Sequence, residues 1–331
     1  MTRIAVLGAG SWGTALANLL AGKSHAVRIW AREAEVVAGI NSEHENQLFL
    51  PGHSLAPSLV ADADAARVVA EADVVVSASP SHAVRRVIGD VATAIRPGTL
   101  VVSATKGIED ASLARMSEVI GAVLPAARVA VLSGPSFASE VAAGQPTAVV
   151  AASTEPASAA EVQELFSTPA FRVYTNQDVI GVELGGSLKN VIAIAAGTLE
   201  GLGLGHNPRA ALLTRGLAEI TRLGAALGAD AATFAGLAGM GDLILTATGA
   251  LSRNRALGMA LAHGESFEAW QARNRTVAEG ANTSRAAARL AQRAGVEMPI
   301  ADEVLAVLFE GKPAHDSVRD LMERELKAEQ W

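Results

Sequence analysis

The chain has 331 residues, half of them hydrophobic and 18% charged, with 27 basic against 34 acidic side chains and a net charge of −7. This length allows two domains with a sizeable core in each, and the composition is that of a soluble α/β protein. The negative charge and the lack of any basic block argue against nucleic acid or acidic membrane surfaces as partners. The sequence has no cysteine, which rules out disulfides and thiolate zinc sites.

The first thirty residues carry the strongest pattern. An apolar run over residues 3–7 predicts a buried strand, a helical segment follows it, and between them Gly8, Gly10 and Gly13 have the G-x-G-x-x-G spacing. Such glycines make a tight turn, let backbone approach a pyrophosphate, and allow the helix to pack closely on the sheet. Because a second strand over 26–30 follows at the spacing of a βαβ unit, we expect dinucleotide binding.

The end of the second strand bears on the choice of cofactor. NAD-binding proteins place an acidic residue there, whereas this sequence reads Trp-Ala-Arg and ends at Arg32. Arg32 can pair with a 2′-phosphate, which favours NADP(H), with NAD(H) as the alternative; an arginine after a strand can also be a solvated charge.

The uncharged stretch 4–22 has the length of a signal peptide, but glycines and polar residues interrupt it. We therefore expect a cytoplasmic protein with no membrane insertion.

Further strands are expected along the first half of the chain. Their ranges are 73–78, 100–104, 128–132, 147–151 and 171–174. Their alternation with helical segments predicts an α/β fold: a doubly wound parallel Rossmann-type sheet with a ligand site along its carboxyl edge. The polar residues at 79–81 either line the cofactor or form a turn with a capped helix.

Near Gly181 the strand patterns stop. We expect a dinucleotide-binding Rossmann-type domain over residues 1–180 and an all-helical substrate-binding and catalytic domain over residues 181–331. Helices are predicted at 183–199, 208–227, 233–240, 253–262, 283–294, 301–309 and, as a charge-rich amphipathic end, 319–330. The apolar helices favour a homodimer, although they need an interior before they need a partner.

Lys189 has the most informative setting of the ionisable residues. It lies apart from the apolar stripe of its helix, on a face of small residues where burial would lower its pKa into the range for proton transfer. The alternative is an exposed lysine over a helix contact.

Asp242 lies on a glycine turn that can hold its carboxylate. The segment 252–255 opens a helix and offers either a phosphate site or ordinary capping. The seven histidines lack metal-ligand spacing, so no metal is assigned.

Seven blocks of sequence together resemble the bacterial NAD(P)-dependent sn-glycerol-3-phosphate dehydrogenases. They are GAGSWGTA at 8–15, ATKGIE at 104–109, SGPSFA at 133–138, ELGGSLKN at 183–190, GMGDL at 239–243, SRNR at 252–255 and VAEG at 277–280. The resemblance implies reversible hydride transfer between NAD(P)H and carbon 2 of dihydroxyacetone phosphate, giving sn-glycerol 3-phosphate for phospholipid synthesis. One departure is Ala247, where many relatives carry a cysteine that is not catalytic.

The resemblance also implies a role for each matching residue. Lys189 matches the proton-transfer lysine, with Asp242 and Asn190 as its partners. Substrate contacts are implied for Lys106, Gly134, Ser136, Lys189, Asp242, Ser252, Arg253 and Asn254. Cofactor contacts, besides the three glycines, are implied for Ser11, Trp12, Arg32, Lys106, Ala138, Arg253, Val277 and Glu279.

Two other functions compete with this one. A two-domain dehydrogenase of 2- or 3-hydroxy acids would share the sheet and a catalytic lysine, but the segment 252–254 favours a phosphorylated substrate. A non-catalytic NADPH-binding sensor would bind the cofactor without turning it over.

Overall fold

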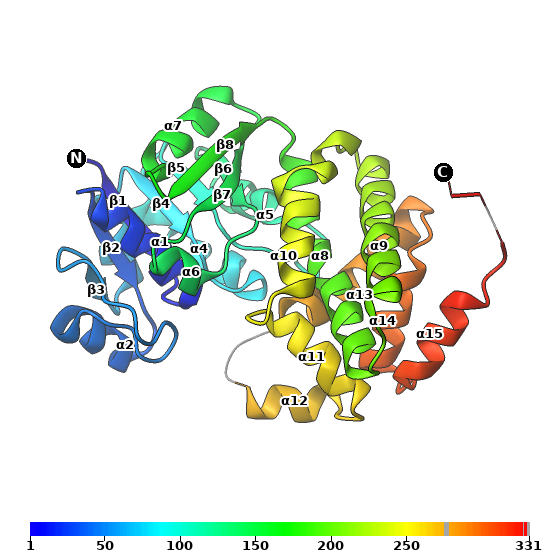
Figure 1. The fold of residues 1–331 in the computed structure, drawn as a ribbon. Helices are drawn as coiled ribbons and strands as arrows, with labels where there is room; N and C mark the ends of the chain where they lie inside the picture. The colour runs from blue at the N-terminus through cyan, green and yellow to red at the C-terminus, as the bar shows by residue number, and fades with distance from the viewer. Residues whose placement is uncertain (275–277, 327, 330–331) are drawn as a thin grey trace.

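The computed structural model describes residues 1–274, 278–326 and 328–329. An eight-stranded sheet with flanking helices forms the N-terminal half, and a bundle of helices forms the C-terminal half (Figure 1). The strands are β1 Arg3–Leu7, β2 Ala26–Trp30, β3 Val60–Asp62, β4 Val74–Ser77, β5 Leu100–Ser103, β6 Arg128–Ser133, β7 Thr147–Ala152 and β8 Phe171–Asn176. This arrangement confirms the predicted fold class.

The strand order is β3-β2-β1-β4-β5-β6-β7-β8. Every neighbouring pair is parallel except β6 and β7, which run antiparallel. The expected parallel arrangement is therefore wrong at β7, because the connection through residues 134–146 turns the chain back beside β6 instead of crossing over the sheet. The order reverses between β1 and β4, which is the position where doubly wound sheets open a crevice for ligands.

Helices cover both faces of the sheet. They are α1 Ser11–Gly22, α2 Ala34–Ala38, α3 Ala65–Val69, α4 Val84–Val91, α5 Met116–Val123, α6 Ala138–Ala142 and α7 Pro156–Phe166, with short turns at Gly39–Glu43, Ser81–Ala83 and Ala92–Ala94. Side chains alternate along β1, so Val6 packs with Leu16 of α1 whereas Leu7 packs with Ile88 of α4. Burial on both faces explains why the central strands are almost continuously apolar.

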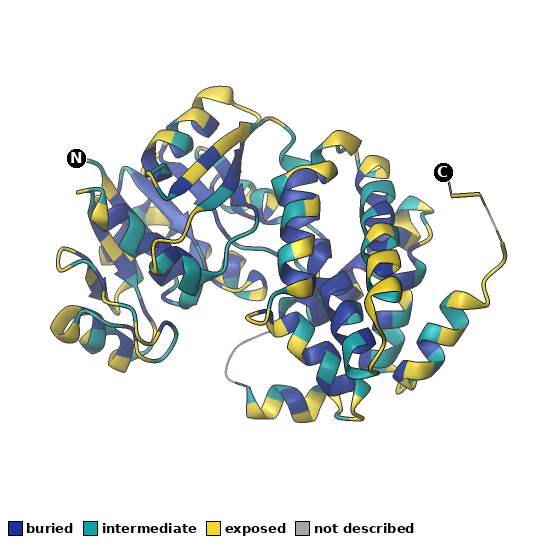
Figure 2. Cartoon of the chain, in the orientation of Figure 1, coloured by how far each residue is buried: buried dark blue, intermediate teal, exposed yellow. Residues whose placement is uncertain are grey.

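The C-terminal half is built around one long helix. Its helices are α8 Val179–Gly201, α9 His206–Ala226, α10 Asp242–Thr248, α11 Arg253–Ala262, α12 Phe267–Arg273, α13 Glu279–Ala294, α14 Pro299–Phe309 and α15 Ala314–Met322, with η4 Ala231–Ala235 and η5 Leu237–Gly241 before α10. Helix α8 packs against α9, α10, α11 and α13, and Figure 2 shows it dark blue in the centre of the bundle. It is long and apolar enough to cross a membrane, but 94% of its most apolar stretch is buried, as in a core helix.

Four local predictions differ from the structure. The helix expected at 233–240 is instead the 3₁₀ turn η4 followed by the π-helical turn η5. Strand β3 was missed because it is a three-residue edge strand whose Val60 is exposed. Helix α12 was also missed. The helix expected at 319–330 instead begins at Ala314, after Pro313, and ends at Met322. Leu326 beyond it is fully exposed, so this leucine adds no packing that would extend the helix.

Candidate active site

The glycine turn joins β1 to α1 at the carboxyl edge of the sheet. Gly8 has a φ of +119°, and a Cβ there would lie 3.0 Å from the backbone of Ala78. A Cβ on Gly13 would lie 1.9 Å from the Gly8 carbonyl oxygen. At Gly10, by contrast, no atom lies within 4 Å of the position that a Cβ would take. Two of the glycines therefore permit packing, and the third leaves open space over the start of α1.

The start of α1 is suited to an anionic ligand. The first N–H groups of a helix have no partner within it, and the helix dipole adds partial positive charge. The indole N–H of Trp12 is buried without a hydrogen-bond partner, whereas the Ser11 hydroxyl donates to the carbonyl of Phe49 at 2.5 Å. The open space at Gly10 and the unpaired N–H groups at the start of α1 fit a dinucleotide pyrophosphate.

Asn46 supports the glycine turn, and sequence reasoning missed it. Its side-chain amide is fully buried and donates to the Ala9 carbonyl at 2.9 Å and to the Thr14 hydroxyl at 2.8 Å. A lone asparagine in a long loop carries no periodicity or motif that would single it out. Its role depends on how the loop folds back over α1.

Arg32 lies just beyond β2, at the edge of the cofactor region. Its side chain is 78% exposed and pairs with the Glu33 carboxylate at 2.8 Å. The arginine therefore has the freedom to reach a ligand, and the structure brings it into contact with none of the other expected site residues that it describes.

Two lysines meet on one aspartate where the sheet faces the helical half. Asp242, at the start of α10, accepts from the Lys189 ammonium of α8 at 2.6 Å and from the Lys106 ammonium after β5 at 2.6 Å. The Thr246 hydroxyl, one turn along α10, lies 2.5 Å from the Lys189 Nζ atom. Lys106 also donates to the Gly134 carbonyl at 3.0 Å. Residues from both halves of the chain thus form one charged centre.

The centre has an unusual charge balance. Lys189 is only 6% exposed, so the alternative of a solvated lysine is wrong. Burial lowers the pKa of Lys189 to about 7; the Asp242 carboxylate opposes this shift, and the Lys106 ammonium adds to it. Burial alone would raise the pKa of Asp242, but the two ammonium groups outweigh it and hold that pKa below its usual value. Lys189 can therefore exchange a proton near neutral pH.

Asn190 and Asn254 form a second buried link beside the lysines. The Asn254 side chain donates to the Asn190 side-chain oxygen at 2.9 Å and accepts from the Gly280 N–H at 3.0 Å. Ser252 caps α11 by accepting from the Arg255 N–H at 3.2 Å. The start of α11 is thereby fixed to α8 and α13.

Glu279 at the start of α13 reaches the carboxyl edge of the sheet. It accepts from the Ser81 hydroxyl at 2.7 Å, and Arg253 lies within electrostatic range of its carboxylate. A Cβ on Gly107 would lie 3.4 Å from the same carboxylate, which places Glu279 beside the Lys106 turn. Ser81 therefore both begins a short 3₁₀ turn and belongs to the site region. Val277 lies outside the described residues.

The loop after β6 brings some of its expected residues to the centre and not others. Ser136 donates to the Gly134 carbonyl at 3.0 Å, the same carbonyl that Lys106 contacts. Ala138 begins α6 and packs on the sheet core instead. Thr246 was missed although it lies four residues from Asp242, a spacing that puts the two on one helix face.

Helices α8 and α11 touch backbone to backbone beside this site. A Cβ on Gly197 would lie 2.0 Å from the Arg255 carbonyl oxygen, and one on Gly258 would lie 2.0 Å from the Ile194 carbonyl oxygen. Glycine at both positions therefore allows the two helix backbones to come closer than any larger residue would permit. This crossing fixes the distance between Lys189 on α8 and the start of α11.

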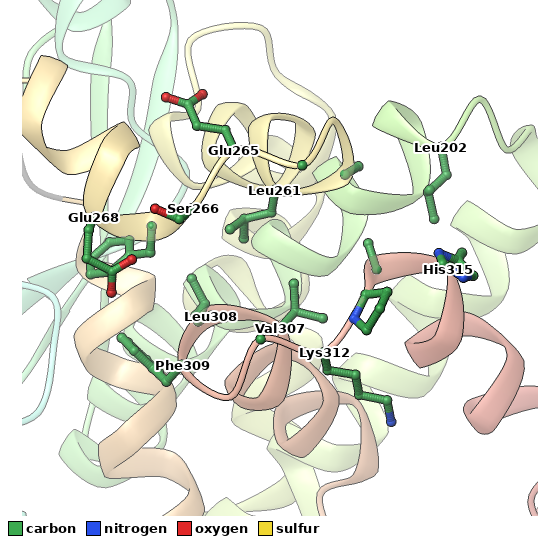
Figure 3. A pocket seen from close by; sticks show the side chains of 16 residues that line it. Leu202, Leu261, Glu265, Ser266, Glu268, Val307, Leu308, Phe309, Lys312 and His315 are labelled. Carbon is green, nitrogen blue, oxygen red and sulfur yellow. The ribbon is translucent and has the colours of Figure 1, made fainter.

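A cavity of about 430 Å³ lies elsewhere, between the α11–α12 turn and the α14–α15 turn (Figure 3). Its charged lining residues include Glu265 and Lys312, which are paired with Arg273 and with two carboxylates respectively. None of the expected site residues that the structure describes lines it.

The sheet is of Rossmann type, has a glycine turn at its carboxyl edge, and faces a buried lysine on the helical half. These features together define a two-part nicotinamide-dinucleotide dehydrogenase. The family can be given more closely. Models of the NAD-dependent glycerol-3-phosphate dehydrogenase N-terminus and C-terminus match residues 3–159 and 178–319. The chain belongs to this family.

Individual relatives agree with the family models. A glycerol-3-phosphate dehydrogenase (NAD(P)+) of Geobacter sulfurreducens is 57% identical over 99% of this chain and 99% of its own. One from Koribacter versatilis is 51% identical over the full length of both. The crystal structure of glycerol-3-phosphate dehydrogenase from Coxiella burnetii has a TM-score of 0.93 at 41% identity, covering 98% of this chain and 99% of that one.

Proposed function

We propose that the chain reduces dihydroxyacetone phosphate reversibly to sn-glycerol 3-phosphate with a nicotinamide dinucleotide. The observation that carries this proposal is the buried Lys189, which shares Asp242 with Lys106 at the meeting of the two halves. Family membership supports the substrate, because the matched models and relatives are named for glycerol 3-phosphate.

Lys189 acts as the general acid and base. When bound, the nicotinamide supplies or accepts the hydride. Lys189 in its ammonium form stabilises the negative charge that develops on the carbonyl oxygen and donates a proton to it. Asp242 orients the ammonium and balances its charge, and Asn190 holds the adjoining segment of α11 through Asn254.

The substrate phosphate binds at the start of α11. Ser252, Arg253 and Asn254 supply a helix N-terminus, a guanidinium and a buried amide. The carbonyl end then lies toward Lys189, with the polar groups of Lys106, Gly134 and Ser136 beside it. Binding of the phosphate thus converts remote binding energy into orientation of the ketone.

A pair of comparisons tests this assignment. We expect Lys189→Ala to bind NADPH with unchanged affinity and to lose nearly all turnover, because the proton donor is removed while the glycine turn is intact. Cofactor affinity is measured by fluorescence titration and turnover by NADPH oxidation. Full turnover in this variant would reject Lys189 as the acid. Wild-type activity on non-phosphorylated keto acids but not on dihydroxyacetone phosphate would favour a hydroxy acid dehydrogenase, and binding without any turnover would favour a sensor.

The cofactor is proposed to lie along the carboxyl edge of the sheet and to be NADP(H) in preference to NAD(H). Gly8, Gly10, Ser11, Trp12 and Gly13 would meet its pyrophosphate, and the remaining contacts are proposed for Arg32, Lys106, Ala138, Arg253, Val277 and Glu279. The preference is supported by the exposed guanidinium beyond β2, which is suited to a 2′-phosphate.

The preference is tested by Arg32→Ala. We expect it to lower kcat/KM for NADPH relative to NADH by about tenfold, the equivalent of one charged hydrogen bond. The matched control is Arg28→Ala, which removes an exposed arginine within β2, four residues before Arg32, and should leave the ratio unchanged. Equal effects of the two substitutions would remove Arg32 from the cofactor site.

We also propose that residues 1–180 bind the cofactor and that residues 181–331 bind the substrate. The enzyme is further proposed to be cytoplasmic, to form a homodimer, and to supply sn-glycerol 3-phosphate for phospholipid synthesis. The dimer is supported by exposed apolar side chains at Met240, Ile244 and Leu251. We expect Ile244→Glu to give a monomer in sedimentation experiments, whereas Leu326→Glu, at an exposed leucine away from this patch, should not. A wild-type monomer would contradict the proposal.

A further inference from the structure

Glu183 joins the two halves of the molecule at a point that the proposed chemistry does not use. It lies on α8, six residues before Lys189, and is 6% exposed. Its carboxylate accepts from three donors around the start of α5: the Arg115 guanidinium at 2.6 Å, the Ser117 N–H at 2.8 Å and the Ser117 hydroxyl at 2.5 Å. A side chain of the helical half therefore caps a helix of the sheet half.

The loop that leads to α5 is the one that carries Lys106. Two further contacts tie this loop to α8: the Gly107 N–H donates to the Ser187 hydroxyl at 2.9 Å, and Ile108 packs in the same apolar cluster as Leu184. The interface from Lys106 to Ser117 is thus continuous along α8, and Glu183 is the charged contact at its end.

We propose that Glu183 is a positioning residue, which fixes the rotation and height of α8 against the sheet half so that Lys189 meets Asp242 and Lys106. The inference rests on the proposed role of Lys189. At 1.5 Å per residue, Glu183 lies about 9 Å along the axis from Lys189. A side chain at a radius of about 5 Å moves by roughly 0.9 Å for each 10° that its helix rotates. Misplacement by about 1 Å can cost about a hundredfold in rate.

The position of α8 should affect turnover more than binding. The proposed phosphate contacts at the start of α11 lie in the helical half, and the glycine turn lies in the sheet half. A small shift between the halves leaves most of each binding surface intact while it separates the reacting groups. Loss of the Glu183 contact therefore predicts a lower kcat with little change in KM.

The shift should also alter the proton donor. Lys189 faces Asp242 on α10 and Lys106 after β5, and its pKa is lowered first by burial and then by Lys106. A loosened α8 admits water, which diminishes the lowering of the pKa by burial, the largest influence on it; the opposing attraction of Asp242 and the smaller repulsion by Lys106 weaken as well, but the loss of the burial effect is expected to outweigh them. In the profile of kcat against pH, the decline that reflects deprotonation of Lys189 (the pH limb) then moves to higher pH.

The test is Glu183→Gln in the full-length enzyme. The amide keeps the size and one acceptor oxygen, but it loses the charge and turns N–H donors toward the Arg115 or Ser117 donors. We expect kcat to fall about tenfold or more, KM for NADPH and dihydroxyacetone phosphate to stay within about threefold, and the pH limb to rise. The double variant Arg115→Gln, Glu183→Gln restores a donor–acceptor pair without charge and should recover threefold or more of kcat.

Glu219→Gln is the matched control. Glu219 is also a buried carboxylate that caps a helix, accepting from the Ile300 N–H at 3.0 Å, but both α9 and α14 belong to the helical half. We expect Glu219→Gln to change stability and leave kcat and the pH limb unchanged. Wild-type kcat and pH profile in folded Glu183→Gln, or equal losses in both variants, would overturn the inference.

Two further variants keep the test decisive. If Glu183→Gln does not fold, Ser117→Ala removes the hydroxyl donor from the opposite side of the same contact and keeps the backbone N–H donor. It should lower kcat about threefold with the same shift in pH dependence, and an unchanged kcat and pH profile would again overturn the inference. If Lys189→Ala is inactive while Glu183→Gln behaves as wild type, the positioning role fails and the proposed function stands. If Lys189→Ala is fully active, the proposed function itself fails.

Discussion

Replacing Asp242 with asparagine tests the charge balance of the two-lysine centre. Asp242 supplies the negative charge that both ammonium groups contact at 2.6 Å, and it supports the protonated form of Lys189 against burial. Asparagine has nearly the same shape but no charge, and its NH₂ group can only donate. In the variant, burial and Lys106 act on Lys189 without opposition, so its pKa falls below about 7.

The size of the effect follows from the usual influence of a nearby opposite charge. Such a charge shifts a pKa by about 1 to 3 units. At pH 7 about half of the wild-type Lys189 is protonated, since its pKa is about 7. After the shift, roughly one tenth to one thousandth is protonated. Reduction requires the ammonium form, so the rate at pH 7 should fall about fivefold to five-hundredfold and recover on acidification.

The assay is the initial rate of NADPH oxidation with saturating dihydroxyacetone phosphate between pH 5 and 9. Wild-type activity should decline as the pH rises through about 7, and the Asp242→Asn limb should lie at lower pH. Asp178→Asn is the control, because Asp178 caps α8 at the Gly181 N–H and contacts neither lysine. An unshifted limb in Asp242→Asn, or an equal shift in the control, would refute the electrostatic reasoning.

Three further predictions concern stability and cofactor binding. A lysine in the unfolded chain keeps its proton up to about pH 10.5, whereas Lys189 in the folded protein loses its proton near pH 7. The free energy of unfolding of the wild type should therefore rise between these two pH values by up to about 5 kcal/mol. Lys189→Met should lack this rise when denaturant titrations at pH 6 and pH 9 are compared. Burial raises the pKa of Glu219 to about 7, so wild-type stability should fall from pH 4.5 to 7 by about 3 kcal/mol, and thermal melts of Glu219→Gln should lack that fall. Gly13→Ala should lower both Tm and NADPH affinity, whereas Gly10→Ala, in open space, should lower affinity alone.

The elements that the sequence predicted are those encoded by local spacing. The strand–glycine–helix unit at residues 3–22 and the small-residue face around Lys189 both follow from periodicity, and the structure has them. The reversed direction of β7 depends on how residues 134–146 fold back, which no periodicity records.

The remaining site contacts join residues that are far apart in the chain. Asn46 reaches the glycine turn from a loop, and Lys106 reaches Asp242 from the other half of the molecule. Glu183 was seen only as part of a motif, because its partners at the start of α5 become neighbours only when the halves dock. Such contacts depend on tertiary packing. From the sequence alone, many other residues of the same types are equally good candidates for each contact.

The glycine crossing of α8 and α11 has a consequence for which sugars the enzyme accepts. In the proposed binding mode the phosphate lies at the start of α11 and the carbonyl at Lys189, so the spacing of the two helices sets the distance between these two groups. A side chain larger than hydrogen at Gly197 or Gly258 would clash with the backbone of the other helix and force the two apart. On that proposal, a ketose phosphate whose carbonyl is separated from its phosphate by more carbons than in dihydroxyacetone phosphate would place the carbonyl beyond the Lys189 ammonium, so the spacing of the two helices would contribute to substrate selectivity.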